Sequence, residues 1–482
     1  MPSMTMKPHL FFPTLTLLLF STSLSAAAVT GGTVVTHTSP NKIEERCVIL
    51  EQMPGGKYSS KDSKAEQAYC KIDLYSQTIA MCPKTWSTSP GTMIYQLSAG
   101  PYKRNPKKFE ASVCSKGKSA ANYVTGKHLK FKNTMNMKDT SSTFSTASLL
   151  YYHFSRYFDT HIHVPVAVQR SIDNKAHLQR VTQRGVKLAS KNKKMIHAAW
   201  LDMQKVQHKP ELYKPTDALF TRDRKQIYGV LLHSPGKRYG VLMNGTRKSG
   251  RGEGQNNDFQ KTPPFLALRS SQTLKKAIRE GIEEASKDHI IKKAIKSEIT
   301  DQQMVYWMQD LTEITLLDYI FNQQDRVGNI DYQEYWYWKK GSSVRKQHAR
   351  TKTPAKNLAK HKPLRIQETF LNDNDAGGRK SYSNFTKKTK MLEKIRHFNA
   401  DTYKQLIKLD NDFAKKGKLY AYVKDSFGLS NKQFLLIVSN THEATAILKQ
   451  SCKQKNLRFD LDPDKFFAKK SSKAKRVNCD KP

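Results

Sequence analysis

Two short polar segments in the carboxyl-terminal half carry residue types that can hold a metal ion beside a phosphate. The first is QDRVGNID, residues 324–331, and the second is NDNDAGGR, residues 372–379. Carboxylate and amide oxygens are the ligands that magnesium and manganese prefer in proteins. Both segments also have the composition of ordinary turns, in which Asn, Asp and Gly are common. Composition alone therefore leaves turn formation and cation binding both open.

A long helix is predicted directly before the first segment. Apolar residues recur at three- and four-residue steps over residues 301–321, which is typical of a helix with one buried face. Thr300 and Gln303 have the spacing of a capping box at its start. We therefore expect the first segment to be a loop that follows a buried helix.

Two strands are predicted next, at residues 332–338 and 364–371, on either side of a basic insert. Their outer ends would bring Asp325 and Asp373 to one edge, where the two carboxylates could share a cation. The insert, residues 339–362, contains lysine, arginine and histidine but no acidic residue. It is interpreted either as a mobile arm that binds an anionic acceptor or as a solvated loop.

The amino-terminal half has the pattern of a small sheet with one inserted helix. Strands are predicted at residues 92–97, 109–115, 127–132 and 164–172, a helix within 141–158, and a hairpin from 227–232 to 239–245. The predicted boundaries are 1–28 for a signal peptide, 29–80 for an extension, 81–246 for the first lobe, 247–265 for a hinge, 266–455 for the second lobe and 456–482 for a basic tail.

This order of motifs resembles the atypical protein-kinase-like superfamily, which includes secretory kinases of Golgi casein kinase type, HipA kinases and phosphatidylinositol kinases. The D-R-x-G-N loop after a long helix and the Asp-Asn turn after the next strands carry the resemblance, over about residues 85–450. It implies an α+β, two-lobed protein-kinase-like fold with a small sheet-rich N-lobe and a helical C-lobe. It also implies phosphoryl transfer from ATP with magnesium or manganese, where positioning and charge neutralisation supply most of the acceleration.

The resemblance implies roles for four residues. Asp325 would be the catalytic aspartate, which accepts or orients the proton of an attacking hydroxyl group. Lys132 would pair with the nucleotide phosphates, and Asp373 and Asn329 would bind the metal.

The sequence departs from the family pattern at two of these positions. The loop lacks the histidine of the usual D-R-H-x-G-N motif, so Asp331 or Asp375 could replace Asn329 as a metal ligand. The predicted helix after Lys132 contains no glutamate to pair with the lysine, and Lys130 is a rival for its role.

The amino terminus predicts export. Lys7 precedes an apolar run over residues 10–24, and small residues through Ala28 predict cleavage after that position. We expect a secreted protein, or one of a periplasm or secretory lumen, with no transmembrane segment. The six cysteines are expected to form disulfides, two near the amino end and Cys452 with Cys479, although sequence alone allows 15 pairings of six cysteines.

The charge balance bears on partners. Lysine and arginine number 83 against 41 for aspartate and glutamate, a net charge of +42. Such a charge attracts polyanions, and export favours an acidic protein, polysaccharide or lipid headgroup over nucleic acid. Three functions stay open: a kinase-like phosphotransferase acting on a hydroxyl of a protein, glycan or lipid; a catalytically inactive kinase-like module that binds anionic surfaces; and a nucleotidyl transferase on the same fold.

Overall fold

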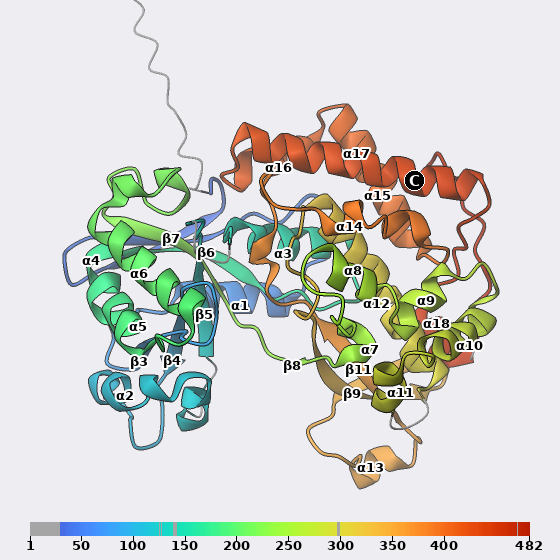
Figure 1. Cartoon of the computed structure of the whole chain (residues 1–482), viewed down its shortest axis with the longest axis horizontal. Coiled ribbons are helices and arrows are strands. Elements are labelled where there is room, and N and C mark those ends of the chain that lie inside the picture. The colour runs from blue at the N-terminus through green and yellow to red at the C-terminus, as the bar shows by residue number, and fades with distance from the viewer. Residues whose placement is uncertain (1–28, 125, 127, 138–141, 296–298, 470) are drawn as a thin grey trace, which may run out of the picture.

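The chain forms two lobes in the computed structural model (Figure 1), with the first half building a sheet and the second half a mainly helical body. The predicted α+β, two-lobed fold, sheet-rich at the amino-terminal side and helical at the carboxyl-terminal side, is confirmed. The structure describes residues 29–124, 126, 128–137, 142–295, 299–469 and 471–482. The predicted signal peptide lies outside the described residues.

A seven-stranded antiparallel sheet forms the first lobe, in the order β1-β2-β6-β7-β5-β4-β3. Its strands are β1 (Thr33–Thr38), β2 (Glu44–Ile49), β3 (Ile79–Pro83), β4 (Gly91–Gln96), β5 (His128–Asn133), β6 (Ala167–Asp173) and β7 (Gln226–Leu232). Strands β1 and β2 come from the predicted extension, so that segment belongs to the sheet. Strand β5, which carries Lys132, lies between β4 and β7, with Lys132 opposite Gly91 and Val230.

Helices cover this sheet more extensively than predicted. They are α1 (Ser60–Cys70), α2 (Pro106–Ser112), α3 (Thr146–Phe158), α4 (Asn174–His177), α5 (Gln183–Leu188) and α6 (Lys194–His208). The strand predicted at residues 109–115 was wrong, because helix α2 occupies most of that segment. Asn105 caps this helix by accepting a hydrogen bond from the Lys108 amide, and Pro106 is its first residue, as helix starts favour.

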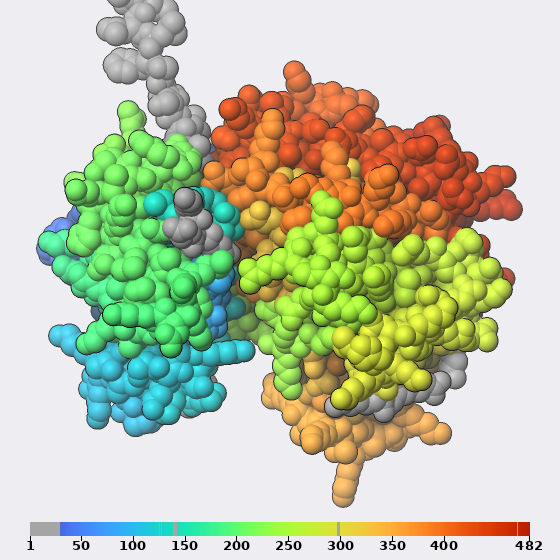
Figure 2. All heavy atoms as spheres, in the orientation of Figure 1, coloured from blue at the N-terminus to red at the C-terminus, as the bar shows by residue number. Residues whose placement is uncertain are grey.

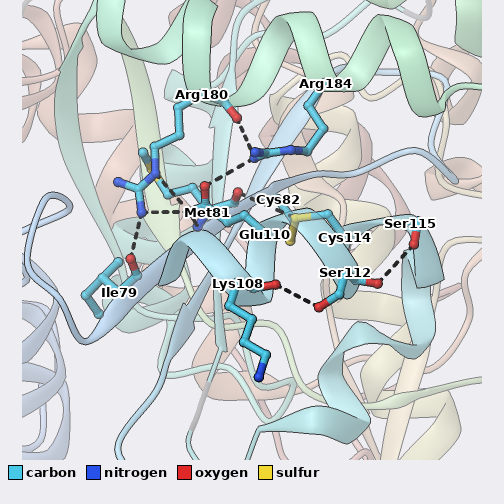
Figure 3. The surroundings of a disulfide bond; sticks show 10 residues. All are labelled: Ile79, Met81, Cys82, Lys108, Glu110, Ser112, Cys114, Ser115, Arg180 and Arg184. Carbon is cyan, nitrogen blue, oxygen red and sulfur yellow. Dashed lines mark hydrogen bonds and ion pairs between the residues drawn. A yellow bond between two sulfur atoms is a disulfide. The ribbon is translucent and has the colours of Figure 1, made fainter. Parts of the chain in front are cut away.

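Helix α2 is fixed to the sheet by covalent and ionic contacts. Cys114 follows α2 and forms a disulfide with Cys82 of β3 (Figure 3). Beside it, the carboxylate of Glu110 pairs with Arg180 at 2.6 Å and with Arg184 at 3.2 Å. These contacts hold α2 against strand β3 and against the segment that contains Arg180 and Arg184.

The chain crosses between the lobes at residues 233–239, where Figure 1 shows β8 between β7 and α7. Two predictions are corrected here. The second arm of the hairpin, residues 239–245, is not a strand, because α7 (Val241–Asn244) occupies it and β8 (Lys237–Arg238) pairs with the second lobe instead. The hinge predicted at 247–265 contains helices α8 (Glu253–Phe259) and α9 (Pro263–Arg269).

The second lobe is built around a buried helix, α12 (Asp301–Ile320), as predicted. The Thr300 hydroxyl accepts a hydrogen bond from the Gln303 amide. The capping box is only half formed, because the Gln303 side chain bonds the backbone of Gln367 instead. The helix is buried all round from Gln303 to Ile320 rather than on one face.

The other helices of the second lobe are α10 (Leu274–Ala285), α11 (His289–Ala294), α13 (Lys356–Ala359), α14 (Phe385–Lys388), α15 (Ala400–Ala414), α16 (Lys418–Ser426), α17 (Asn431–Lys453) and α18 (Pro463–Lys469). Helices α9, α10, α14, α17 and α18 pack against α12, and the remaining helices of the second lobe lie farther out. Apolar residues of α3, α12 and α17 belong to one continuous core, so α3 of the first lobe packs into the second. Within the described part of the chain, no helix is long and apolar enough to cross a membrane.

A four-stranded sheet lies beside α12. Strand β9 (Asp331–Lys340) pairs with β8, with β10 (Ser343–His348) and with β11 (Leu364–Phe370), each antiparallel. Strands β9 and β11 match the two predicted strands. The basic insert is not structureless along its whole length, because β10 pairs with β9 and α13 follows.

All six cysteines form disulfides. The pairs are Cys47–Cys70, Cys82–Cys114 and Cys452–Cys479. The prediction of two bridges near the amino end and one that ties the tail is confirmed.

Candidate active site between the lobes

The loop after α12 is held in place by a buried arginine. Arg326 forms two hydrogen bonds with the Asp318 carboxylate of α12, at 2.9 and 3.0 Å. It also donates to the Asn372 carbonyl at 3.0 Å and to the Asn374 side chain at 2.8 Å. Arg326 is buried and thus joins the loop to the turn after β11.

The turn after β11 directs two carboxylates toward the first lobe. Asp373 has a left-handed backbone with φ of 55°, and Asn374 to Ala376 form a single helical turn. Asn tolerates such conformations well and Asp does so more than most residues, which explains the turn-like sequence here. Asp373 and Asp375 both contact Lys132.

Lys132 of β5 bridges the lobes. Its Nζ lies 2.9 Å from Asp373 Oδ1 and 2.6 Å from Asp375 Oδ1, and its side chain is 9% exposed. Desolvation alone would raise the pKa of Asp373, but the charge of Lys132, followed by those of Lys84 and Lys130, holds it well below its ordinary value. The lysine and the predicted metal-binding aspartate therefore meet directly.

Asp325 opens into the same cavity. Desolvation in the cavity wall, together with the neighbouring charge of Asp373, raises the pKa of Asp325 to about 6. A carboxylate with such a pKa is ionised near neutral pH yet basic enough to accept a proton, which suits a general base.

Asn329 lies beside Asp325 in the cavity wall, and its side chain forms hydrogen bonds there. Its side-chain amide donates to the Asp325 carbonyl at 2.8 Å, and its Oδ1 accepts a hydrogen bond from Arg238 of β8. Arg238 also pairs with Asp331 at 2.6 Å and with Asp373 at 3.2 Å. The shortened loop thus still brings Asn329, Asp331 and Asp373 around a single cationic group.

These residues line a cavity of about 960 Å³ with walls from both lobes. Figure 2 shows the two lobes joined across their upper part and separated by a furrow below. The cavity contains Lys84, Lys118, Lys130 and Lys237 in addition to the residues above. Burial, opposed by the charge of Asp373, lowers the pKa of Lys84 to about 8. A cavity of this size and charge fits a phosphorylated ligand of nucleotide size.

The donor atoms suit a hard divalent cation. Asp373 and Asp331 offer carboxylate oxygens and Asn329 offers an amide oxygen, the ligand types that magnesium and manganese accept. Among the described residues, no cluster of three or more His, Cys, Asp or Glu side chains makes a metal site by itself. Magnesium is usually bound by one or two carboxylates together with substrate phosphates.

Lys84 and Arg238 are two of the cavity residues that sequence reasoning missed. Lys84 follows strand β3 directly, but the sequence around it carries no recognisable motif. Arg238 was hidden by the incorrect hairpin, which placed it in a turn of the first lobe. The glycine-rich run at residues 250–254 precedes and begins α8 and does not line the cavity.

The pair His161 and His163 does not form a metal site either. His161 Nδ1 lies 2.7 Å from the Asp310 carboxylate, and His163 contacts Glu368. Each histidine therefore has its own acidic partner, away from the cavity residues.

Comparison with known proteins gives a structural likeness only. The sequence matches no protein-family model, and it matches no curated protein. Among solved structures, the Golgi casein kinase with Mn and ADP bound aligns at a TM-score of 0.40 and 11% identity, over 82% of this chain and 77% of that one. A second structure of the Golgi casein kinase aligns at 0.42 and 10% identity, over 83% and 78%. Both TM-scores are below 0.5, so the likeness assigns no role to a residue of this chain.

Proposed function

We propose that this protein is a kinase-like phosphotransferase that uses ATP and magnesium or manganese to phosphorylate a hydroxyl group of a protein, glycan or lipid. One observation carries the proposal. The buried Lys132 of the sheet-containing lobe lines the same cavity as an acidic loop and turn of the helical lobe. Lys132 and Asp325, which belongs to that loop, are 193 positions apart in the sequence.

Each residue has a task in this reaction. Asp325 accepts the proton of the attacking hydroxyl as that oxygen bonds the γ-phosphorus and the bond from phosphorus to the departing ADP oxygen breaks. Lys132 neutralises phosphate charge from the side of the sheet. Asp373 and Asn329, with Asp331, would hold the cation, which supplies further neutralisation of the phosphates.

The reaction is tested with the mature chain, ATP labelled at the γ- or α-position, and extracts that contain acidic proteins and glycans. We expect label to move from the γ-position in the presence of Mg²⁺ or Mn²⁺, and D325N and D373N to abolish transfer while the fold is retained. Transfer from the α-position instead would select the nucleotidyl transferase. No transfer, with intact ATP binding, would overturn the proposal.

A second candidate is an inactive kinase-like module that binds anionic partners. The internal ion pairs of Asp373 with Lys132 and Arg238 favour it, because they satisfy this carboxylate without a metal ion. The two candidates differ in the labelling experiment, since the inactive module binds acidic polymers but transfers no label.

The basic character of the chain fits an acidic acceptor in either case. The three disulfides agree with a secreted or lumenal protein, and we infer that the acceptor is met there. Nucleic acid is a less suitable partner for an exported chain.

A further inference from the structure

We propose that the guanidinium group of Arg238 occupies the metal position of this site and has to move away before a divalent ion binds. This inference rests on the phosphotransferase function proposed above. Arg238 belongs to the segment that links the two lobes. It would therefore couple metal binding to the segment that connects the lobes.

The contacts of the guanidinium group are those of a bound cation. Its Nε lies 2.6 Å from Asp331 Oδ1, and its Nη2 lies 3.2 Å from Asp373 Oδ2. Its Nη1 donates to the side-chain oxygen of Asn329 and to the carbonyl of Gly328. The guanidinium group thus contacts four oxygen atoms, three from carboxylate or amide side chains and one from a backbone carbonyl. Oxygen atoms of these types are the ligands that magnesium selects.

The backbone of Arg238 is held in the small sheet, whereas its side chain is partly exposed to solvent. Arg238 pairs with Asp331 across β8 and β9, and the next amide, that of Tyr239, donates to the Ile330 carbonyl at 3.0 Å. Gly236 approaches so closely that a Cβ there would lie 3.1 Å from the Cβ of Asp331. The side chain of Arg238 is nonetheless 42% exposed.

The second cation on Asp373 is bound differently. Lys132 is 9% exposed and also holds Asp375, whereas the side chain of Arg238 is 42% exposed and its partners Asp331 and Asp373 are 12% and 25% exposed. Exposed ion pairs contribute little to stability and buried ones are costly to break. A metal ion therefore displaces Arg238 and leaves Lys132 in place.

The test is Mn²⁺ binding to the full mature chain without nucleotide, measured from the paramagnetic resonance signal of free Mn²⁺. We expect R238Q to bind Mn²⁺ at least tenfold more tightly than the wild type, because no internal cation competes. K130Q is the matched control, since Lys130 acts on Asp373 through its charge alone; it should change the affinity by less than threefold. The double variant R238Q/D373N should lose the gain, and thermal unfolding checks that each variant is folded.

Three results would overturn the inference: unchanged or weaker binding by R238Q, an equal gain in K130Q, or a gain that survives D373N. Its failure is distinguishable from that of the proposed function. Mn²⁺-dependent phosphate transfer by the wild type, together with unchanged affinity in R238Q, removes only the role of Arg238. Absence of Mn²⁺ binding by every variant, with and without ATP, removes both.

Discussion

Lys132 shows how the site is held together before any ligand binds. Its amino group is shared by Asp373 and Asp375, and the three side chains are mostly withdrawn from solvent. Removing one partner of a buried ion pair leaves the other charge buried and uncompensated. The resulting loss of stability is larger than the net stabilisation that the intact pair provides. Lys132 therefore affects both stability and ligand binding.

We predict that K132M lowers the free energy of unfolding at pH 7 by about 3 kcal/mol and weakens ATP binding. Urea denaturation measures the first effect and calorimetric titration with Mg-ATP the second. K237M is the control, because Lys237 is an exposed lysine of the same cavity; its stability should change by less than about 0.5 kcal/mol. Equal destabilisation by both variants would contradict the role of the buried contacts.

Asp325 gives a prediction about pH. Because desolvation and Asp373 raise its pKa to about 6 in the folded chain, against an ordinary value of 3.8, the folded state holds this proton more tightly than the unfolded state. The contribution of Asp325 to stability is therefore present below pH 3.8 and is lost as the pH rises through about 6.

Above about pH 6 the ionised Asp325 carboxylate is disfavoured by burial and by Asp373, which lowers the stability of the fold, and D325N removes this cost. In metal-free buffer, we expect the melting temperature of D325N to exceed that of the wild type at pH 8 and the difference to shrink toward pH 4. The same variant should transfer no phosphate. Melting curves at the two pH values provide the measurement, and a difference that is independent of pH would contradict the raised pKa.

The sequence located part of this site for physical reasons. Asp325 and Asp373 follow regular elements whose periodicity is visible, so their meeting at one edge could be predicted. Lys132 was identified through the family resemblance rather than from its neighbours. The contacts of Arg238 depend on which lobe pairs with β8, and no local pattern determines that choice.

At the scale of elements, hydrophobic periodicity predicted the bounds of secondary structure best for long, continuous elements. Helix α12 and strands β9 and β11 lie close to their predicted bounds. Residues 109–115 were misassigned because their β-prone residues outweighed the helix-starting signal of Asn105 and Pro106. Residues 239–245 were misassigned because a short apolar run does not distinguish a strand from a helix turn.

The hairpin of β9 and β10 presents basic side chains on an ordered element. Lys339, Lys340 and Arg345 are exposed, whereas Lys346 pairs with the buried Glu368 at 2.9 Å. An ordered basic surface can hold an acidic acceptor without first losing the conformational entropy of a flexible loop. We therefore propose that this hairpin contributes to acceptor binding.

We predict that replacing Lys339, Lys340 and Arg345 by glutamine weakens binding of polyglutamate or heparin by roughly 3- to 10-fold at low salt, with a smaller effect at 0.5 M salt because charges are then screened. Fluorescence anisotropy with labelled polymer provides the measurement. The control triple variant replaces Lys415, Lys416 and Lys418, which are exposed at the end of α15 and the start of α16. If both triple variants lose affinity equally, overall charge rather than the hairpin binds the polymer.

At the scale of the whole molecule, the disulfides strengthen each lobe separately. Two bridges lie in the sheet-containing lobe and one ties the tail to the helical lobe, and since all six cysteines are used, no disulfide joins the lobes. The contacts that connect the lobes include the packing of α3, the ion pairs of Lys132, and those of His161 with Asp310 and His163 with Glu368. Relative movement of the lobes is therefore not blocked by a covalent bond.

The bridge between Cys452 and Cys479 closes a segment of 27 residues that packs against α15, where the Tyr403 hydroxyl donates to the Cys479 carbonyl at 2.8 Å. Constraining a loop of this length reduces the entropy of the unfolded chain, so we predict that C452S/C479S lowers the free energy of unfolding by about 2–4 kcal/mol. Chemical denaturation without reductant provides the measurement. Because the tail lies outside the cavity between the lobes, the affinity for Mg-ATP should stay the same. A loss of ATP binding in a variant that is still folded would mean that the tail also positions the site.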